Sequence, residues 1–71
     1  MPDQEASLTP REVEVLRLVA DGRTGRQIAE ILGVTVRTAH AHTESIIAKL
    51  GASNRTHAVA IAIRDGIVAM C

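Results

Sequence analysis

The fold is decided by residues 27–42, which read QIAEILGVTVRTAHAH. Ile28, Ala29 and Leu32 form a short apolar face that Gly33 ends, and Thr35 can cap a further helix after it. Upstream, Thr24 and Gln27 have the three-residue spacing of a capping box. Two helices joined by a glycine-containing turn of three or four residues are typical of a helix-turn-helix. The stretch therefore predicts this motif.

The helix that begins after Thr35 is expected to be the longest and to end at Gly51. Its apolar stripe is made of Ala39, His42, Ile46 and Leu50. His42 therefore faces the domain, and we predict that its ring is buried and hydrogen-bonded. The opposite stripe is too polar for a core and is available for contact with a partner; its members are Arg37, His40, Ala41, Glu44 and Ala48.

His40 and His42 suggest a metal-binding pair, but on a helix the two side chains cannot bind the same metal ion. Residues two apart on a helix point about 200° away from each other, because each residue turns the chain by about 100°. Two histidines that share a metal on one helix need the spacing i and i+4. We expect neither a metal nor any other cofactor.

The first helix is predicted from the capping box of Thr9 and Glu12, with Pro10 at the first helical position. Glu12, Val15, Leu16 and Val19 then recur on one face, and Gly22 follows where a helix can end. The last segment, HAVAIAIRDGIVAM at residues 57–70, is ambiguous. Its alternation and the Asp65-Gly66 pair allow two strands, whereas its alanines and Asn54 favour a helix over about residues 55–65.

Composition limits the possibilities further. The chain has 71 residues, no aromatic residue of the Phe, Tyr or Trp type, and a hydrophobic content of 46%. A core of Leu, Ile, Val and Ala suits close helix packing, so we expect a single all-α domain at residues 8–71, preceded by a linker or tail at residues 1–7. No apolar run approaches the roughly 20 residues of a membrane span. The one cysteine, Cys71, cannot form an internal disulfide and fits a reducing cytoplasm.

The formal net charge is zero, so the composition lacks the strong basic excess usual for nucleic-acid binders. Residues 1–32 hold four Arg against six acidic residues, whereas residues 33–71 hold three Arg and one Lys against two. The second half is therefore mildly basic.

Nearly the whole chain, from residue 8 to about 67, resembles the LuxR-type helix-turn-helix, also called the FixJ/NarL or GerE type. The resemblance rests on LTPREVEVLRLVADG at residues 8–22, QIAEILGVTVRTAHAH at 27–42 and IIAKLGASNRTHAV at 46–59. It implies a four-helix DNA-binding module of bacterial transcription regulators, a bundle whose third helix enters the major groove and whose fourth helix forms a homodimer. It also implies a separate N-terminal sensing or receiver domain, which this chain does not contain. Two departures from the family's usual pattern bear on the strength of DNA binding. Ala39 replaces the usual valine, and the exposed stripe contains fewer Lys, Arg and Asn residues than is common in the family.

The resemblance places five residues near the DNA backbone, namely Arg26, Thr35, Arg37, Thr38 and Lys49. Cations and helix-start hydroxyls suit phosphate contacts, although Thr35 can serve only as a cap and Lys49 can simply pair with an acid. The base-reading candidates are His40, Ala41 and Glu44, since they can hydrogen-bond base edges, pack on a thymine methyl group, or accept from a cytosine amino group. For the dimer interface we expect Val59, Ala60 and Ile63.

Two other functions compete with DNA binding. The zero net charge and Glu44 also fit a helix-turn-helix that has become a protein-interaction module. An enzyme is disfavoured because the sequence contains no nucleophile–base pair, metal cluster or phosphate loop.

Overall fold

A computed structural model describes residues 8–68, which form four helices in the order α1 (Pro10–Ala20), α2 (Gly25–Leu32), α3 (Val36–Leu50) and α4 (Arg55–Arg64). The all-α prediction is confirmed for this part of the chain, and the strand alternative is wrong for residues 57–68. The predicted linker or tail at residues 1–7 and the terminal thiol of Cys71 lie outside the described residues.

The helices begin where the sequence places caps. Thr9 and Glu12 form the predicted capping box, in which the Glu12 N–H donates to Thr9 Oγ1 at 3.1 Å and the Thr9 N–H donates to Glu12 Oε1 at 2.9 Å. Thr24 and Gln27 form a second one with the same geometry. These caps satisfy backbone N–H groups that the first turn of a helix leaves without partners.

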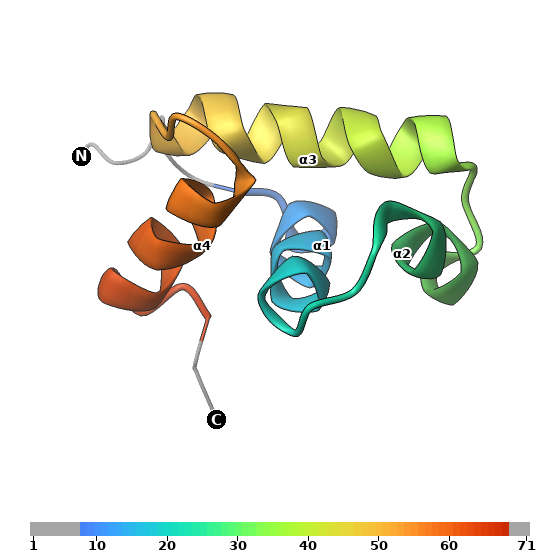
Figure 1. Cartoon of the computed structure of the whole chain (residues 1–71), viewed down its shortest axis with the longest axis horizontal. Helices are drawn as coiled ribbons and strands as arrows, with labels where there is room; N and C mark the ends of the chain where they lie inside the picture. The colour runs from blue at the N-terminus through green and yellow to red at the C-terminus, as the bar shows by residue number, and fades with distance from the viewer. Residues whose placement is uncertain (1–7, 69–71) are drawn as a thin grey trace.

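Helix α3 lies across one side of the molecule, and the other three helices pack beneath it (Figure 1). The core is aliphatic, as predicted from the composition. Its largest fully buried side chains are Val15, Leu16, Ile28 and Ile46, from α1, α2 and α3. Helix α4 adds Ala58 and Ala62, whose small side chains permit close approach to the core. One face of α3 is thus buried along its length, while none of the other three described helices covers the opposite face.

The chain returns to the core after α4. The N–H of Ile67 donates to the carbonyl oxygen of Ala62 at 2.8 Å, and Val68 is buried with 4% of its surface exposed. Among the described residues, no helix is long and apolar enough to cross a membrane.

Candidate nucleic-acid interface

The turn between α2 and α3 has a fixed geometry. Gly33 adopts φ +71°, a left-handed conformation that glycine reaches without the steric cost of a Cβ. The Val34 N–H donates to the carbonyl oxygen of Ala29 at 2.9 Å, and the Gly33 N–H donates to that of Glu30 at 3.3 Å. This pair of bonds is the Schellman pattern that closes helix ends. The start of α3 is therefore held firmly against α2, as the helix-turn-helix prediction requires.

Thr35 and Thr38 act as a pair at the start of α3. The Thr38 N–H donates to Thr35 Oγ1 at 3.1 Å, so Thr35 is the N-cap. The Thr35 hydroxyl in turn donates to Thr38 Oγ1 at 3.0 Å. The hydroxyl hydrogen of Thr35 is thus used, whereas that of Thr38 is left to donate to another group.

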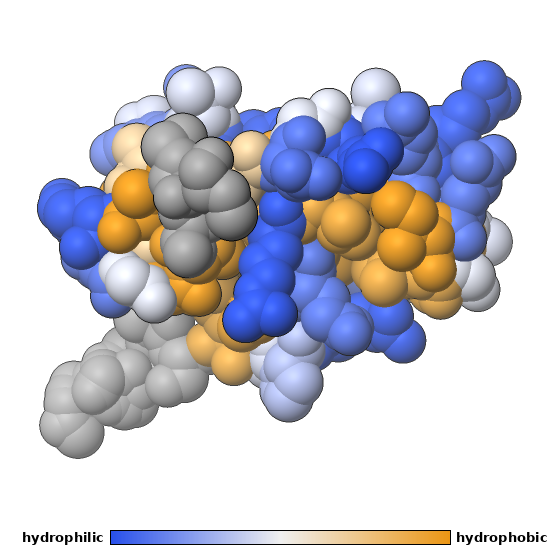
Figure 2. Space-filling model, turned by 90° about the horizontal axis from the view of Figure 1, so that it is seen from below, coloured by the Kyte–Doolittle hydropathy of each residue, from blue (hydrophilic) through white to orange (hydrophobic). Residues whose placement is uncertain are grey.

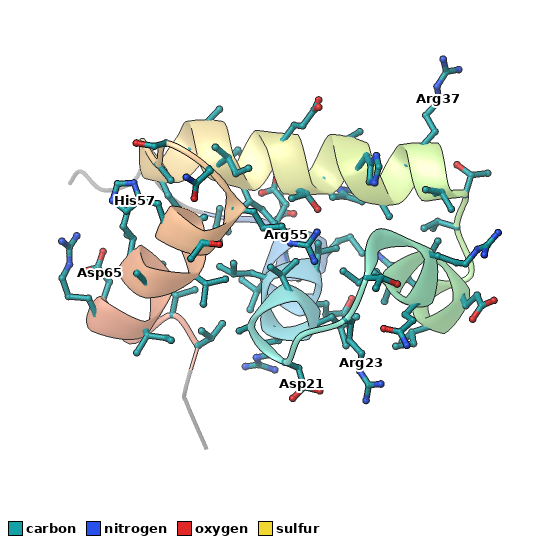
Figure 3. All side chains as sticks on the ribbon, in the orientation of Figure 1. Asp21, Arg23, Arg37, Arg55, His57 and Asp65 are labelled. Carbon is teal, nitrogen blue, oxygen red and sulfur yellow. The ribbon has the colours of Figure 1, made fainter. Side chains whose placement is uncertain are left out.

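The polar stripe predicted on α3 is exposed along its full length: Arg37, His40, Ala41, Glu44 and Ala48 all lie at the surface. Figure 3 shows the Arg37 side chain pointing away from the helix and from the rest of the domain. Arg26, in the first turn of α2, is also exposed. The structure therefore brings the three base-reading candidates onto one uncovered face, with cations near one end.

The structure does not confirm the prediction that the His42 ring is buried and hydrogen-bonded. It is only half-buried, and within residues 8–68 its ring makes no hydrogen bond. Ala39 and Ile46 fill the core side of α3, while the larger, polar ring of His42 stays at the margin of that face. Within the same residues, no group of three or more His, Cys, Asp and Glu is arranged to hold a metal ion.

Lys49 is held by a buried acid. Its Nζ lies 2.7 Å from Oε1 of Glu12, whose side chain is only 6% exposed. Ser45 Oγ donates to the other carboxylate oxygen of Glu12 at 2.7 Å. Burial by itself raises the pKa of Glu12, but hydrogen bonds from Lys49, Ser45 and the Thr9 N–H, with the charge of Lys49, lower it to about 2. The charge of Lys49 is therefore largely compensated inside the domain.

Two polar contacts between elements were not predicted from the sequence: Glu12, expected only as a capping residue, is the acid that pairs with Lys49, and Arg55 bonds a distant backbone carbonyl. Arg55 Nη2 donates to the carbonyl oxygen of Arg23 at 2.7 Å, which ties the start of α4 to the turn between α1 and α2 (Figure 3). A backbone carbonyl gives no sequence signal, and Glu12 lies 37 residues before Lys49. The only available hint was an acid on the apolar stripe of α1.

The predicted dimer residues divide between core and surface. Val59 and Ile63 are half-buried and pack against the core, whereas Ala60 is exposed. The other apolar residues of α4 do not add to this surface, because Ala58, Ile61 and Ala62 are buried. The positions of α4 that are exposed are Arg55, Thr56, His57, Ala60 and Arg64.

Comparison with known proteins gives consistent matches. The family described as bacterial regulatory proteins, luxR family, matches residues 6–62. Transcriptional activator protein BjaR1 of Bradyrhizobium diazoefficiens is 49% identical over 67 residues, which cover 94% of this chain and 28% of BjaR1. The chain thus spans less than a third of that relative.

Solved structures match the fold as well. Transcription factor GerE has a TM-score of 0.83 at 31% identity, over 87% of this chain and 92% of GerE. A complex of Vibrio cholera VqmA with ligand and DNA also gives 0.83, at 28% identity, over 92% of this chain and 28% of VqmA.

Proposed function

Because the chain belongs to the luxR family of bacterial regulatory proteins, as a DNA-binding domain and not an enzyme, we propose that it binds double-stranded DNA sequence-specifically through the outer face of α3. The observation that carries the proposal is the polar stripe of α3, which is exposed on the side that no other helix covers. An α-helix fits the major groove of B-DNA, where each base pair presents a distinct pattern of donors and acceptors. The similar fold of a protein solved with DNA supports this docking.

His40, Ala41 and Glu44 are the proposed base-reading residues. They occupy successive positions of the stripe, so about one turn of α3 would follow the groove floor. A histidine nitrogen can donate to or accept from a base edge, and an alanine methyl group packs on thymine. Glu44 can accept only, which restricts it to a donor such as the cytosine amino group.

Phosphate contacts are proposed for Arg26, Thr35, Arg37, Thr38 and Lys49. Support differs among them. The exposed Arg26 and Arg37 and the unused hydroxyl hydrogen of Thr38 suit direct contacts. The hydroxyl of Thr35 is already committed, so only its place at the positive end of α3 favours a phosphate. Lys49 has donors to spare, but its bond to Glu12 reduces the charge that it offers to DNA.

The full-length protein is proposed to act as a homodimer through α4, on two DNA half-sites related by two-fold symmetry. Ala60 would lie at the centre of the contact, with the outward parts of Val59 and Ile63 beside it. Since the chain spans 28% of BjaR1, we further propose that a sensing or receiver domain precedes it in a cytoplasmic regulator.

A protein-interaction module is the second candidate. Two large hydrophobic side chains flank the turn of the helix-turn-helix, with Ile31 54% and Val36 42% exposed. Figure 2 shows hydrophobic surface among hydrophilic side chains on the face opposite α3. Such hydrophobic surface can serve contacts with another protein, and the zero net charge of the chain is compatible with that role.

One experiment separates the two candidates. Duplexes that bind the chain are selected from a pool with a randomised central stretch, and affinity is then measured for the selected and a scrambled duplex. DNA recognition predicts an enriched sequence, tighter binding of the selected duplex, and weaker binding of both as salt rises. A pool that yields no enriched sequence, with binding that salt does not weaken, would favour the interaction module.

A further inference from the structure

Gly25 stands at the first position of α2, where glycine is a costly choice. Glycine loses more conformational freedom on folding than alanine does, and no positive φ angle requires it here. The reason lies in α3. A Cβ at Gly25 would lie 2.8 Å from Nε2 of His40, closer than Cβ contacts normally come, and 3.1 Å from Cδ2, which is tight, so the His40 side chain would have to turn aside. The missing side chain of Gly25 is therefore the space that the His40 ring uses.

His40 meets Gly25 with an edge of its ring. Only Nε2 and Cδ2 of the ring come within 4 Å of the Cβ position, whereas a ring stacked face-on would bring its other atoms equally near. The ring vertex opposite this edge is Nδ1. That nitrogen is accordingly the one turned away from α2, on a side chain that is itself exposed.

We propose that Gly25 is a positioning residue for DNA recognition: by leaving room on α2, it admits the orientation of the His40 ring that presents Nδ1 to a base edge. This inference rests on the proposed function, in which His40 reads the major groove. A side chain at position 25 would force the ring to turn, so the room left by Gly25 favours affinity for the base that matches this orientation. Sequence preference would then depend on a residue outside the recognition helix.

The competing explanation is that Gly25 acts on DNA directly. A small residue at the start of a helix lets a phosphate approach the backbone N–H groups closely. That role changes affinity for every sequence alike, because phosphate contacts carry no base information. The two explanations therefore differ in what happens to sequence preference.

A double-mutant cycle tests the proposal with Gly25→Ala, His40→Ala and the double variant. The measured quantity is the ratio of affinities for the selected duplex and for a duplex changed at one base pair, taken at each position. His40→Ala should lower this ratio at one position by roughly 3–10-fold, the value of one hydrogen bond. Gly25→Ala should lower it at the same position, and the double variant should lose no more than His40→Ala alone.

Arg26→Ala is the matched control from the same turn of α2, and it should weaken binding to all duplexes without changing the ratio. Two substitutions at His40 test the nitrogen itself. The side-chain amide of asparagine lies near the place of Nδ1, and that of glutamine near the place of Nε2. His40→Asn should retain more of the preference than His40→Gln, and circular dichroism should show that all variants keep their helices.

The placement is also measured without DNA, as a nuclear Overhauser effect between the His40 ring Hδ2 and the Gly25 Hα protons. Its absence from the wild-type chain would overturn the proposal. So would an unchanged preference in Gly25→Ala, or an equal loss of affinity from Gly25→Ala with and without His40. If the Overhauser effect is present but the wild type selects no sequence, the proposed function fails, and the reading role of His40 fails with it.

Discussion

Glu12 shows how a single buried charge can hold two helices together. Its carboxylate lies at the start of α1 and accepts hydrogen bonds from Ser45 and Lys49 near the end of α3. Removing one partner of a buried ion pair costs several kcal/mol, because it leaves the other charge uncompensated. The orientation of α3 on the domain therefore depends on a residue far from the proposed DNA contacts.

Acid should destabilise the domain through Glu12. Its pKa is about 2 in the folded protein against 4.5 for an ordinary glutamate, so the unfolded chain binds the proton more readily. The stabilisation is complete above pH 4.5, falls progressively below it, and is lost as the pH reaches about 2. Urea unfolding across this range should reveal a loss of about 3 kcal/mol. Glu12→Gln is the control and should not show this loss of unfolding free energy between pH 4.5 and 2. If the unfolding free energy of the variant depended on pH in the same way, the loss would not come from Glu12.

A substitution of Glu44 best tests whether this residue reads a base or is only repelled by the DNA backbone. It lies on the stripe proposed to face the groove, yet the phosphate backbone repels a carboxylate. If it accepts from cytosine, as we expect, Glu44→Ala should relax preference at one position by about 1–3 kcal/mol. If it only repels, the variant should bind every sequence more tightly with its preference unchanged. Affinities for selected and scrambled duplexes at two salt concentrations separate these results.

At the scale of elements, α3 begins with two hydroxyl groups that have different roles: that of Thr35 caps the helix, and that of Thr38 can still donate a hydrogen bond. Thr35→Ala removes the N-cap and should lower the free energy of unfolding by about 1 kcal/mol. Thr38→Ala removes the hydroxyl that can still donate, so it should weaken DNA binding for all sequences with a smaller effect on stability. Urea unfolding and duplex titration of the two variants provide the comparison. An equal loss of stability in both would mean that the two hydroxyls form one structural unit.

Self-association through α4 is best tested at its exposed position. Ile63 packs against the core, so a charge there would also destabilise the fold. Ala60→Glu places the charge on the surface instead and should weaken dimerisation while the helix content survives. Sedimentation equilibrium measures the association, and Arg64→Glu serves as an exposed control on the same helix. A dimer that tolerates Ala60→Glu would have its interface elsewhere.

The elements themselves were predictable because their signals are local. Thr9, Thr24 and Thr35 each stand at a helix start, and a glycine follows each predicted end, so the bounds of α1, α2 and α3 follow from neighbouring residues. The contacts between elements were not predictable in the same way. The bond from Arg55 to the carbonyl oxygen of Arg23 spans 32 residues, and no pattern marks it. The apolar residues of α4 likewise did not reveal which of them the core would bury.

The residues of the proposed site also differ in how far the sequence could predict them. The exposed stripe of α3 was predictable from helical periodicity alone, since its members alternate with Ala39 and Ile46 of the core. Two properties of the proposed site required the structure, one at Lys49 beside the stripe and one at His40 on it. The charge of Lys49 is shared with a buried carboxylate, and the ring of His40 lies against a glycine of another helix. Both depend on how α3 sits on α1 and α2.

At the scale of the whole molecule, a chain with no net charge must place its few cations where DNA can meet them. Arg26 and Arg37 are exposed near the starts of α2 and α3, whose backbone N–H groups add a partial positive charge. Lys49 contributes less, because Glu12 compensates it. We therefore expect weak binding by a single domain, and affinity that depends on two domains acting together on paired half-sites.

The salt dependence of binding to a selected duplex, measured beside a scrambled one, tests the central claim most directly. With four or five phosphate contacts per domain, the logarithm of the affinity should fall linearly with the logarithm of the salt concentration, with a slope of about −4 for each bound domain. The selected duplex should stay the tighter ligand throughout, since base contacts are less sensitive to salt than phosphate contacts are. A slope near zero and equal affinities for the two duplexes would contradict the account.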